Sequence, residues 1–174
     1  MLSILHLSNN DINGGAARAA YRIHRCIADN KSSYLVNSSM KVVKKYGSDP
    51  TVTCLNNNSF FWKRLQPRIS RFLKSNLTTT NRSAHNIAYP NTGILKELNK
   101  DKSLSKIIHL HWLGDNTISI EEVGKLKCPI FWTLHDQWPF CGAEHYTHPP
   151  IKNNGLQIND FRYRQNYSSK SRIF

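Results

Sequence analysis

The chain begins with an apolar run, a polar segment and a pair of glycines, followed by a stretch with helical periodicity. Residues 2–7 are mostly apolar, residues 8–11 are all polar, and Gly14 and Gly15 follow. Between residues 16 and 27, apolar side chains recur every three or four positions, which is the spacing of one helix face. The pattern predicts a strand, a polar turn with a glycine pair, and a helix.

Two more apolar runs predict strands later in the chain. Residues 106–113 and residues 129–134 each read as a buried strand with polar residues at its carboxyl end. Between them, residues 118–126 predict a short helix whose cap is Ser119 or Thr117. Strands that alternate with helices favour the α/β class, here a Rossmann-like, mostly parallel sheet flanked by helices.

The rest of the chain defines the expected domain organisation. Residues 34–36 predict a second strand, and residues 60–74 predict a basic amphipathic helix that either packs onto a neighbour or lies on an anionic membrane. Residues 76–90 are rich in Asn, Thr and Ser and predict a loop. We expect one Rossmann-like domain over residues 1–148 and a polar, poorly structured tail over residues 149–174.

Length and composition agree with one globular domain. The chain has 174 residues, enough for one α/β domain with a core, and 39% of them are hydrophobic. No stretch reaches the ~18 apolar residues that would span a bilayer, and the first residues lack the features of a signal peptide, so a cytoplasmic location is expected. The four cysteines form no CxxC pair, which argues against a zinc knuckle or a disulfide framework and favours reduced thiols.

The charge is strongly positive. Lys and Arg total 24 against 11 Asp and Glu, a formal net charge of +13. Such a surplus attracts polyanions, which include nucleic acid, an anionic lipid leaflet and phosphorylated substrates, and it does not choose among them. The basic residues are spread along the chain without the interleaved aromatics of a single-strand platform. We therefore expect no specific nucleic-acid partner, and peripheral contact with the anionic inner-membrane surface stays open.

Polar clusters follow the predicted strands at the end where ligands bind in open α/β sheets. The segment Asn13-Gly14-Gly15 opens a helix, where exposed N–H groups favour an anion such as phosphate, although a tight turn alone would also need glycine. His109 and His111 alternate with Leu110, so both imidazoles face one side of the strand.

The histidines and one carboxylate allow two interpretations. His109 and His111, together with His135 and Asp136, are residue types that could ligate a metal, as in metal-dependent hydrolases. Alternatively, at least one of the first two is a packed, hydrogen-bonded core residue. His135 and Asp136 beside Trp138 could also orient a sugar, since polar groups bond its hydroxyls while an aromatic face covers the ring, or they could form a capped turn.

Three segments together resemble a known family. Residues 5–22, which include Asn13-Gly14-Gly15, residues 108–112 and residues 132–140 resemble the amino-terminal domain of the family-four (group 1) retaining glycosyltransferases. The similarity is greatest to the subgroup that builds bacterial exopolysaccharide, colanic acid and O-antigen, and it covers roughly residues 2–148.

The resemblance implies an enzyme of the GT-B kind, with two Rossmann-like domains, no essential metal and no cofactor besides the nucleotide-sugar donor. The amino-terminal domain is then expected to bind a saccharide or lipid-linked acceptor, and a carboxyl-terminal domain to hold most of the donor. By motif position, Gly14 and Gly15 approach the donor phosphates. The expected catalytic residues are His135, which lines the cleft near the transferred sugar, and Asp136, which orients it. Substrate-binding positions implied in the same way, without a catalytic role, are Asn13, His109, His111 and Trp138.

The sequence departs from the family pattern in two places. The carboxyl-terminal domain with its paired glutamates is absent, so we expect a truncated product that is inactive alone or a non-enzymatic remnant or binding module with the same fold. Relatives also carry a cysteine-rich loop after a GGCHY segment, whereas residues 141–146 read Cys-Gly-Ala-Glu-His-Tyr with no further cysteine. No metal or disulfide is therefore expected in that loop, and the metal-dependent hydrolase is the remaining alternative.

Overall fold

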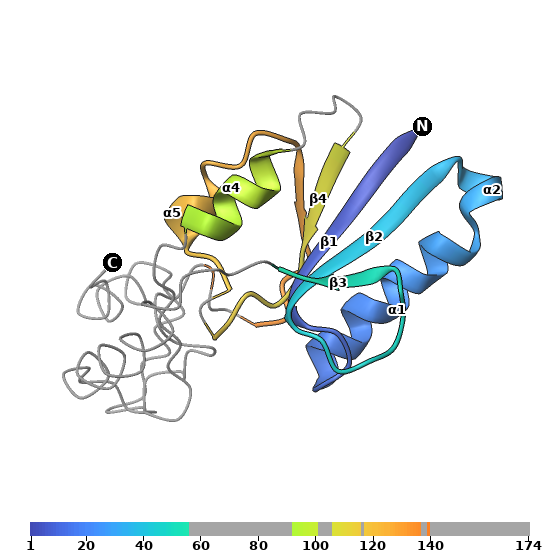
Figure 1. Ribbon diagram of the computed structural model, residues 1–174, viewed down its shortest axis with the longest axis horizontal. Helices are drawn as coiled ribbons and strands as arrows, with labels where there is room; N and C mark the ends of the chain where they lie inside the picture. The colour runs from blue at the N-terminus through green and yellow to red at the C-terminus, as the bar shows by residue number, and fades with distance from the viewer. Residues whose placement is uncertain (56–91, 101–105, 116, 137–138, 140–174) are drawn as a thin grey trace, which may run out of the picture. The chain divides into compact units, whose positions relative to one another are not determined.

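The fold is described from a computed structural model (Figure 1). It describes residues 1–55, 92–100, 106–115, 117–136 and 139. All the helices and strands named below lie in these ranges.

The chain divides into two compact units. The first comprises Met1–Ser59 and Ala88–His135, and the second comprises Phe60–Ile87 and Asp136–Phe174. All the elements below belong to the first unit. The amphipathic helix, the loop and the tail that the sequence predicts over residues 60–74, 76–90 and 149–174 lie outside the described residues.

A parallel sheet forms the centre of the first unit. Its five strands stand in the order β3-β2-β1-β4-β5, and every neighbouring pair is parallel (Figure 1). The strands are β1 (Leu2–Asn10), β2 (Val36–Lys44), β3 (Val52–Cys54), β4 (Lys106–Leu110) and β5 (Ile130–Trp132). The predicted fold class, a Rossmann-like parallel sheet flanked by helices, is confirmed.

Helices cover both faces of this sheet. They are α1 (Gly15–Asp29), α2 (Lys31–Tyr34), α4 (Thr92–Lys100) and α5 (Ile120–Val123). Helix α1 lies on one side of the sheet, while α4 and α5 lie on the other (Figure 1). Among the described helices, none is both long and apolar enough to cross a lipid bilayer.

The core is divided between the two faces because side chains of a strand alternate in direction. On the α1 face, Ala20 of the helix packs with Met40, Val42 and Val52 of the strands, and each is at most 1% exposed. On the α4 face, buried aliphatic side chains of the helix cover those of β1 and β4. These residues are Ile94, Leu98, Leu5, Leu7, Ile108 and Leu110.

The structure corrects two predictions near the start of the chain. The predicted second strand is present as β2 but does not lie at residues 34–36, because Tyr34 ends α2 and Leu35 adopts a left-handed backbone with φ of 51°, so that β2 begins only at Val36. The predicted polar turn at residues 8–11 is also wrong, because β1 runs on to Asn10 and buries these polar residues. In addition, β3 and α4 were not predicted.

The later elements agree with the sequence but are shorter. Strand β4 ends at Leu110 and β5 at Trp132, inside the predicted runs. Helix α5 begins after Ser119, whose hydroxyl accepts from the main-chain N–H of Glu122 at 3.3 Å. The Glu122 side chain in turn accepts from the N–H of Ser119, also at 3.3 Å. This reciprocal capping box selects Ser119, rather than Thr117, as the cap.

Candidate functional site

The order of the strands locates the candidate site. From β1 the chain continues through α1 to β2 on one side of β1, whereas β4 lies on the other side of β1 and is preceded by α4 on the opposite face. The connections therefore diverge between β1 and β4, which is the topological switch point of the sheet. In open α/β sheets, ligands bind outside the carboxyl ends of the strands at such a point.

Buried polar residues at the end of β1 organise the surrounding loops. The side-chain amide of Asn9 donates to the carbonyl of Gly114 at 2.9 Å and to the hydroxyl of Thr117 at 3.1 Å. The side-chain oxygen of Asn10 accepts from the main-chain N–H of Asn13 at 2.8 Å. Asn9 thus ties β1 to the loop after β4, and Asn10 shapes the approach to the glycine pair.

Asp11 joins the loop after β1 to the loop after β2. Its carboxylate, in a side chain that is 1% exposed, accepts from the main-chain N–H groups of Ile12 at 3.1 Å, Tyr46 at 2.9 Å and Gly47 at 2.8 Å. Buried carboxylates are tolerated when such hydrogen bonds replace water. Sequence reasoning missed the role of Asn9, Asn10 and Asp11 because polar residues after an apolar run indicate a turn.

The glycine pair lies where the sequence predicts it, at the start of α1. Gly14 is the N-cap, with φ of 93° and ψ of 169°, and Gly15 is the first helical residue. No side chain caps this helix start, and residues 12–15 are exposed. A Cβ atom on either glycine would meet no atom of the described residues within 4 Å. Open space therefore borders the N–H groups at this helix terminus.

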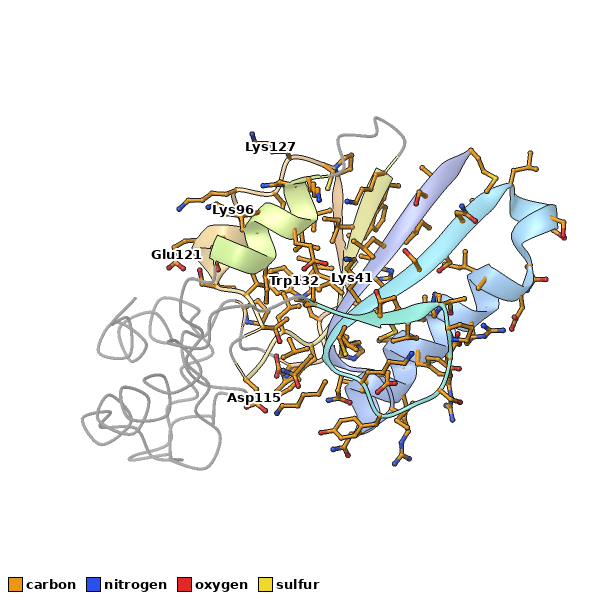
Figure 2. The ribbon with its side chains drawn as sticks, in the orientation of Figure 1. Lys41, Lys96, Asp115, Glu121, Lys127 and Trp132 are labelled. Carbon is orange, nitrogen blue, oxygen red and sulfur yellow. The ribbon has the colours of Figure 1, made fainter. Side chains whose placement is uncertain are left out.

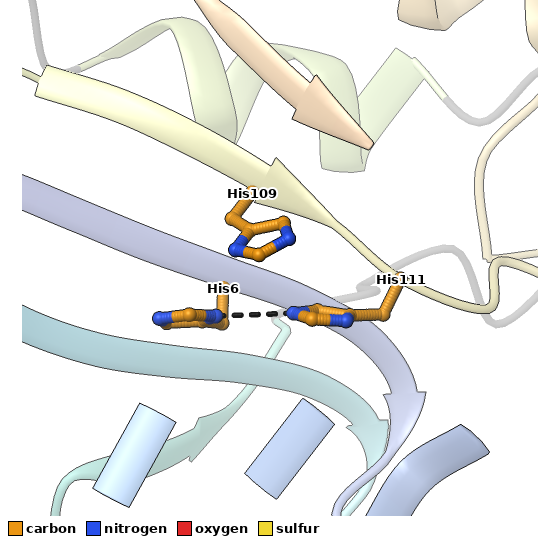
Figure 3. A group of neighbouring side chains, drawn as sticks. All are labelled: His6, His109 and His111. Atoms are coloured by element: carbon orange, nitrogen blue, oxygen red, sulfur yellow. Dashed lines mark hydrogen bonds between the residues drawn. The ribbon is translucent and has the colours of Figure 1, made fainter. Parts of the chain in front are cut away.

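Histidines from two adjacent strands gather on one face of the sheet. His6 of β1 and His109 of β4 are directly paired in register, and their ring centroids lie 5.0 Å apart. The rings of His109 and His111 lie 4.2 Å apart, which confirms that both face the same side (Figure 3). His6 was not a sequence candidate, because only the strand register brings it beside residues about a hundred positions away.

Hydrogen bonds connect most of these imidazoles. Nδ1 of His6 lies 3.0 Å from Nε2 of His111 (Figure 3), and Nδ1 of His111 lies 3.4 Å from Nε2 of His135. Nε2 of His109 lies 2.8 Å from the hydroxyl of Thr133. His111 is 1% exposed, so the prediction that at least one histidine of the pair is a packed, hydrogen-bonded core residue is confirmed.

Burial keeps the inner imidazoles neutral. It lowers the pKa of His6 to about 3, with smaller contributions from His109 and His24. It also lowers the pKa of His111 to about 2, and nearby His109, His6 and His135 add to that shift. The pKa of His109 is lowered as well, first by burial and then by His135. At neutral pH each of these rings is therefore uncharged, with an N–H on one nitrogen and a lone pair on the other.

The nitrogens of His6, His109 and His111 invite a test as a metal site, since one from each ring lies within 4.8 Å of the others. His6 and His111 have nearly coplanar rings, at 19°, whose centroids are 5.4 Å apart, so they meet edge to edge in line. A tetrahedral metal ion with bonds of about 2.0–2.1 Å would hold two nitrogens about 3.3 Å apart, with both lone pairs directed at the ion and not at each other. The observed 3.0 Å and the in-line rings fit a hydrogen bond between His6 and His111, and a metal ion at this group would have to replace that bond.

The remaining predicted site residues have different outcomes. His135 follows β5 and lies beside His111, whose main-chain carbonyl accepts from the indole N–H of Trp132 at 3.1 Å. Asp136 belongs to the second unit, and Trp138 lies outside the described residues. Their roles stay predictions from the resemblance. Cys26 and Cys54 are exposed, and neither forms a disulfide within the described residues.

A lysine-bordered hollow lies at the opposite end of the sheet, near the first residues of β1 and β4. It is lined by Ser3, Leu5, Ser39, Lys41, Lys96, Glu97, Lys100 and Lys106. Lys41 of β2 is paired with Glu97 of α4, and the ammonium of Lys106 donates to the carbonyl of Leu98 at 3.0 Å. Lys96 also projects from α4 (Figure 2). Part of the local positive charge is therefore already used within the fold.

No protein-family model, no curated protein and no solved structure matches this chain.

Proposed function

We propose that this chain is the acceptor-side domain of a retaining GT-B glycosyltransferase. The enzyme would transfer a sugar from a nucleotide-sugar donor to a saccharide or lipid-linked acceptor during synthesis of a bacterial surface polysaccharide. It would act in the cytoplasm, at or near the anionic inner face of the membrane, and without a metal ion or other cofactor.

The position of the three family-like segments carries the proposal. One segment holds most of β1 and the glycine pair, the second holds the end of β4 with His109 and His111, and the third begins at the last residue of β5 and includes His135. Strands β1, β4 and β5 are adjacent and parallel, so these segments end at one edge of the sheet, beside the switch point. This is the edge at which open α/β sheets bind their ligands.

The chemistry of this edge supports a phosphorylated sugar donor. The uncapped start of α1 offers main-chain N–H groups, and the partial positive charge of a helix N-terminus favours phosphate. Neutral imidazoles can donate to or accept from sugar hydroxyls. The net charge of +13 would favour approach of an anionic donor and of a lipid-linked acceptor at an anionic membrane.

Sugar transfer is the direct test. The full chain is incubated with nucleotide-sugar donors and saccharide or lipid-linked acceptors, alone and with a carboxyl-terminal donor-binding domain of the same family. Product formed in either mixture supports the proposal. Saccharide or donor binding without product would favour a binding module instead, and neither binding nor product would refute the proposal.

A glycine variant sharpens this experiment. Gly15→Ala places a methyl group in the open space at the start of α1, where the backbone is helical and tolerates alanine. If donor phosphate packs there, donor affinity falls about tenfold or more while the fold is unchanged. Ser32→Ala is the matched control, since Ser32 is exposed on α2. Equal donor affinity in both variants would show that the donor phosphate does not bind at this helix start.

A further inference from the structure

A continuous chain of imidazoles leads from the core of the first unit to the predicted sugar-facing residue. It begins at His6, which is fully buried in β1, passes through His111 after β4, and ends at His135 after β5. The contacts join Nδ1 of His6 to Nε2 of His111, and Nδ1 of His111 to Nε2 of His135. His111 thus uses both ring nitrogens within the chain.

Such a chain has only two self-consistent proton arrangements. A neutral imidazole has one N–H donor and one lone-pair acceptor, and the inner two rings are neutral at pH 7. If His6 donates from Nδ1, His111 must donate from Nδ1 to Nε2 of His135. If His135 donates from Nε2, His111 must donate from Nε2 to Nδ1 of His6, whose own proton then sits on Nε2.

The buried end of the chain favours the first arrangement. Nε2 of His6 is buried and has no hydrogen-bond partner among the described residues. The second arrangement would bury an N–H there without an acceptor, and buried donors without a partner are rarer in native proteins than buried acceptors without one. The first arrangement leaves only a lone pair at that position and satisfies every other contact in the chain.

We infer that His6 and His111 are positioning residues that hold His135 in the Nδ1–H tautomer, with its Nε2 accepting a hydrogen bond from His111. His109 is outside the chain, because its Nε2 is used by Thr133. The tautomer of His135 is a property of the resting protein. Its relevance to sugar transfer rests on the proposed function.

Nuclear magnetic resonance reads the tautomers directly. Long-range proton–nitrogen correlation spectra of the nitrogen-15-labelled full chain at pH 7.5 distinguish Nδ1–H from Nε2–H in each histidine, and single His→Gln variants assign the signals. We expect Nδ1–H for His6, His111 and His135. A predominant Nε2–H form of His135 would overturn the inference, as would a stoichiometric metal ion found by elemental analysis.

Two substitutions of His6 separate positioning from packing. His6→Asn keeps a donor near the Nδ1 position and should retain the tautomer of His135. His6→Leu removes the donor and should lower the preference of His135 for Nδ1–H about three- to tenfold, the equivalent of one neutral hydrogen bond. If His6→Leu does not fold, the wild-type and His6→Asn spectra decide the question.

His24→Leu is the matched control. His24 lies in the same buried layer, with its ring 5.6 Å from that of His6, but its nitrogens contact Ser38 and Thr51 and not the chain. The control should leave His135 unchanged, and an equal change in both Leu variants would overturn the inference. Because these spectra need no substrate, tautomers as expected without sugar transfer would refute only the proposed function. Transfer with the opposite tautomer would refute only the positioning role.

Discussion

The main-chain N–H of Gly47 donates to Oδ2 of Asp11 at 2.8 Å, and a Cβ atom on residue 47 would lie 3.0 Å from that same oxygen. The carboxylate cannot simply move aside, because it also accepts from the main-chain N–H groups of Ile12 and Tyr46. The loop after β2 is therefore held against the end of β1 through a position where a side chain would press against the carboxylate.

Gly47→Ala should lower the free energy of unfolding by about 1–3 kcal/mol, because the added methyl group strains or breaks hydrogen bonds to a buried carboxylate. Urea unfolding monitored by circular dichroism measures this change. Gly124→Ala is the control, since its Cβ would lie 3.6 Å from the nearest atom and its φ is −63°. Equal stability of the two variants would show that the contact between Asp11 and Gly47 does not constrain the loop.

Gly14→Ala should also destabilise the fold, for a different reason. Its backbone, with φ of 93° and ψ of 169°, is a conformation that only glycine adopts without strain, and the cost to alanine is about 1–3 kcal/mol. Gly15→Ala, one residue later in helical backbone, should not lower stability. Thermal unfolding of the pair measures the difference. If Gly14→Ala unfolded at the temperature of Gly15→Ala, the strain argument would fail.

Stability should decline in mildly acidic solution because buried histidines must be protonated. The pKa of His6 falls from 6.5 in the unfolded chain to about 3 in the fold, and that of His111 falls to about 2. Between the folded and unfolded pKa values, the unfolded chain binds more protons than the folded one. The stability that depends on these neutral histidines is therefore fully present above pH 6.5 and is lost as the pH falls toward 3. Each group contributes a slope of up to about 1.4 kcal/mol per pH unit.

Urea unfolding at pH 7.5, 6, 5 and 4 tests this expectation. The pKa values of His24 and His109 are also lowered, so they act in the same direction. His6→Leu should reduce the slope of unfolding free energy against pH by up to about 1.4 kcal/mol per pH unit, the contribution of one proton. Burial raises the pKa of Asp49, but hydrogen bonds from Thr51 and Tyr21 and the charge of Arg25 outweigh it and lower this pKa to about 2. Asp49 therefore changes the stability only below about pH 4. A stability that did not change between pH 6.5 and 4.5 would contradict neutral buried histidines.

Ser119→Ala removes the cap of α5 and should destabilise the protein by about 1 kcal/mol, since both reciprocal bonds with Glu122 depend on this residue. Ser32→Ala, on an exposed surface of α2, should change stability by less than about 0.5 kcal/mol. Guanidinium unfolding of both variants measures the difference. Similar values for the two would mean that the capping box contributes nothing to stability.

Local patterns accounted for much of the fold. The period of residues 16–27 predicted α1, and the glycine pair before it marked the helix start, because both signals depend on neighbours in sequence. Alternation along β4 was enough to place His109 and His111 on one side. The strand at residues 34–36 was mispredicted because an apolar triplet carries no sign of the left-handed turn at Leu35.

By itself, the sequence determined the α/β class, the start of α1 and the polar clusters at strand ends, because these follow from local periodicity and turn chemistry. Only the tertiary structure decided that β1 stands between β2 and β4, since strand order depends on contacts between distant segments. The register of β1 with β4 then places His6 beside His109 and His111. Burial of Asn9 and Asp11 was decided in the same way, because their hydrogen-bond partners come from loops far along the chain.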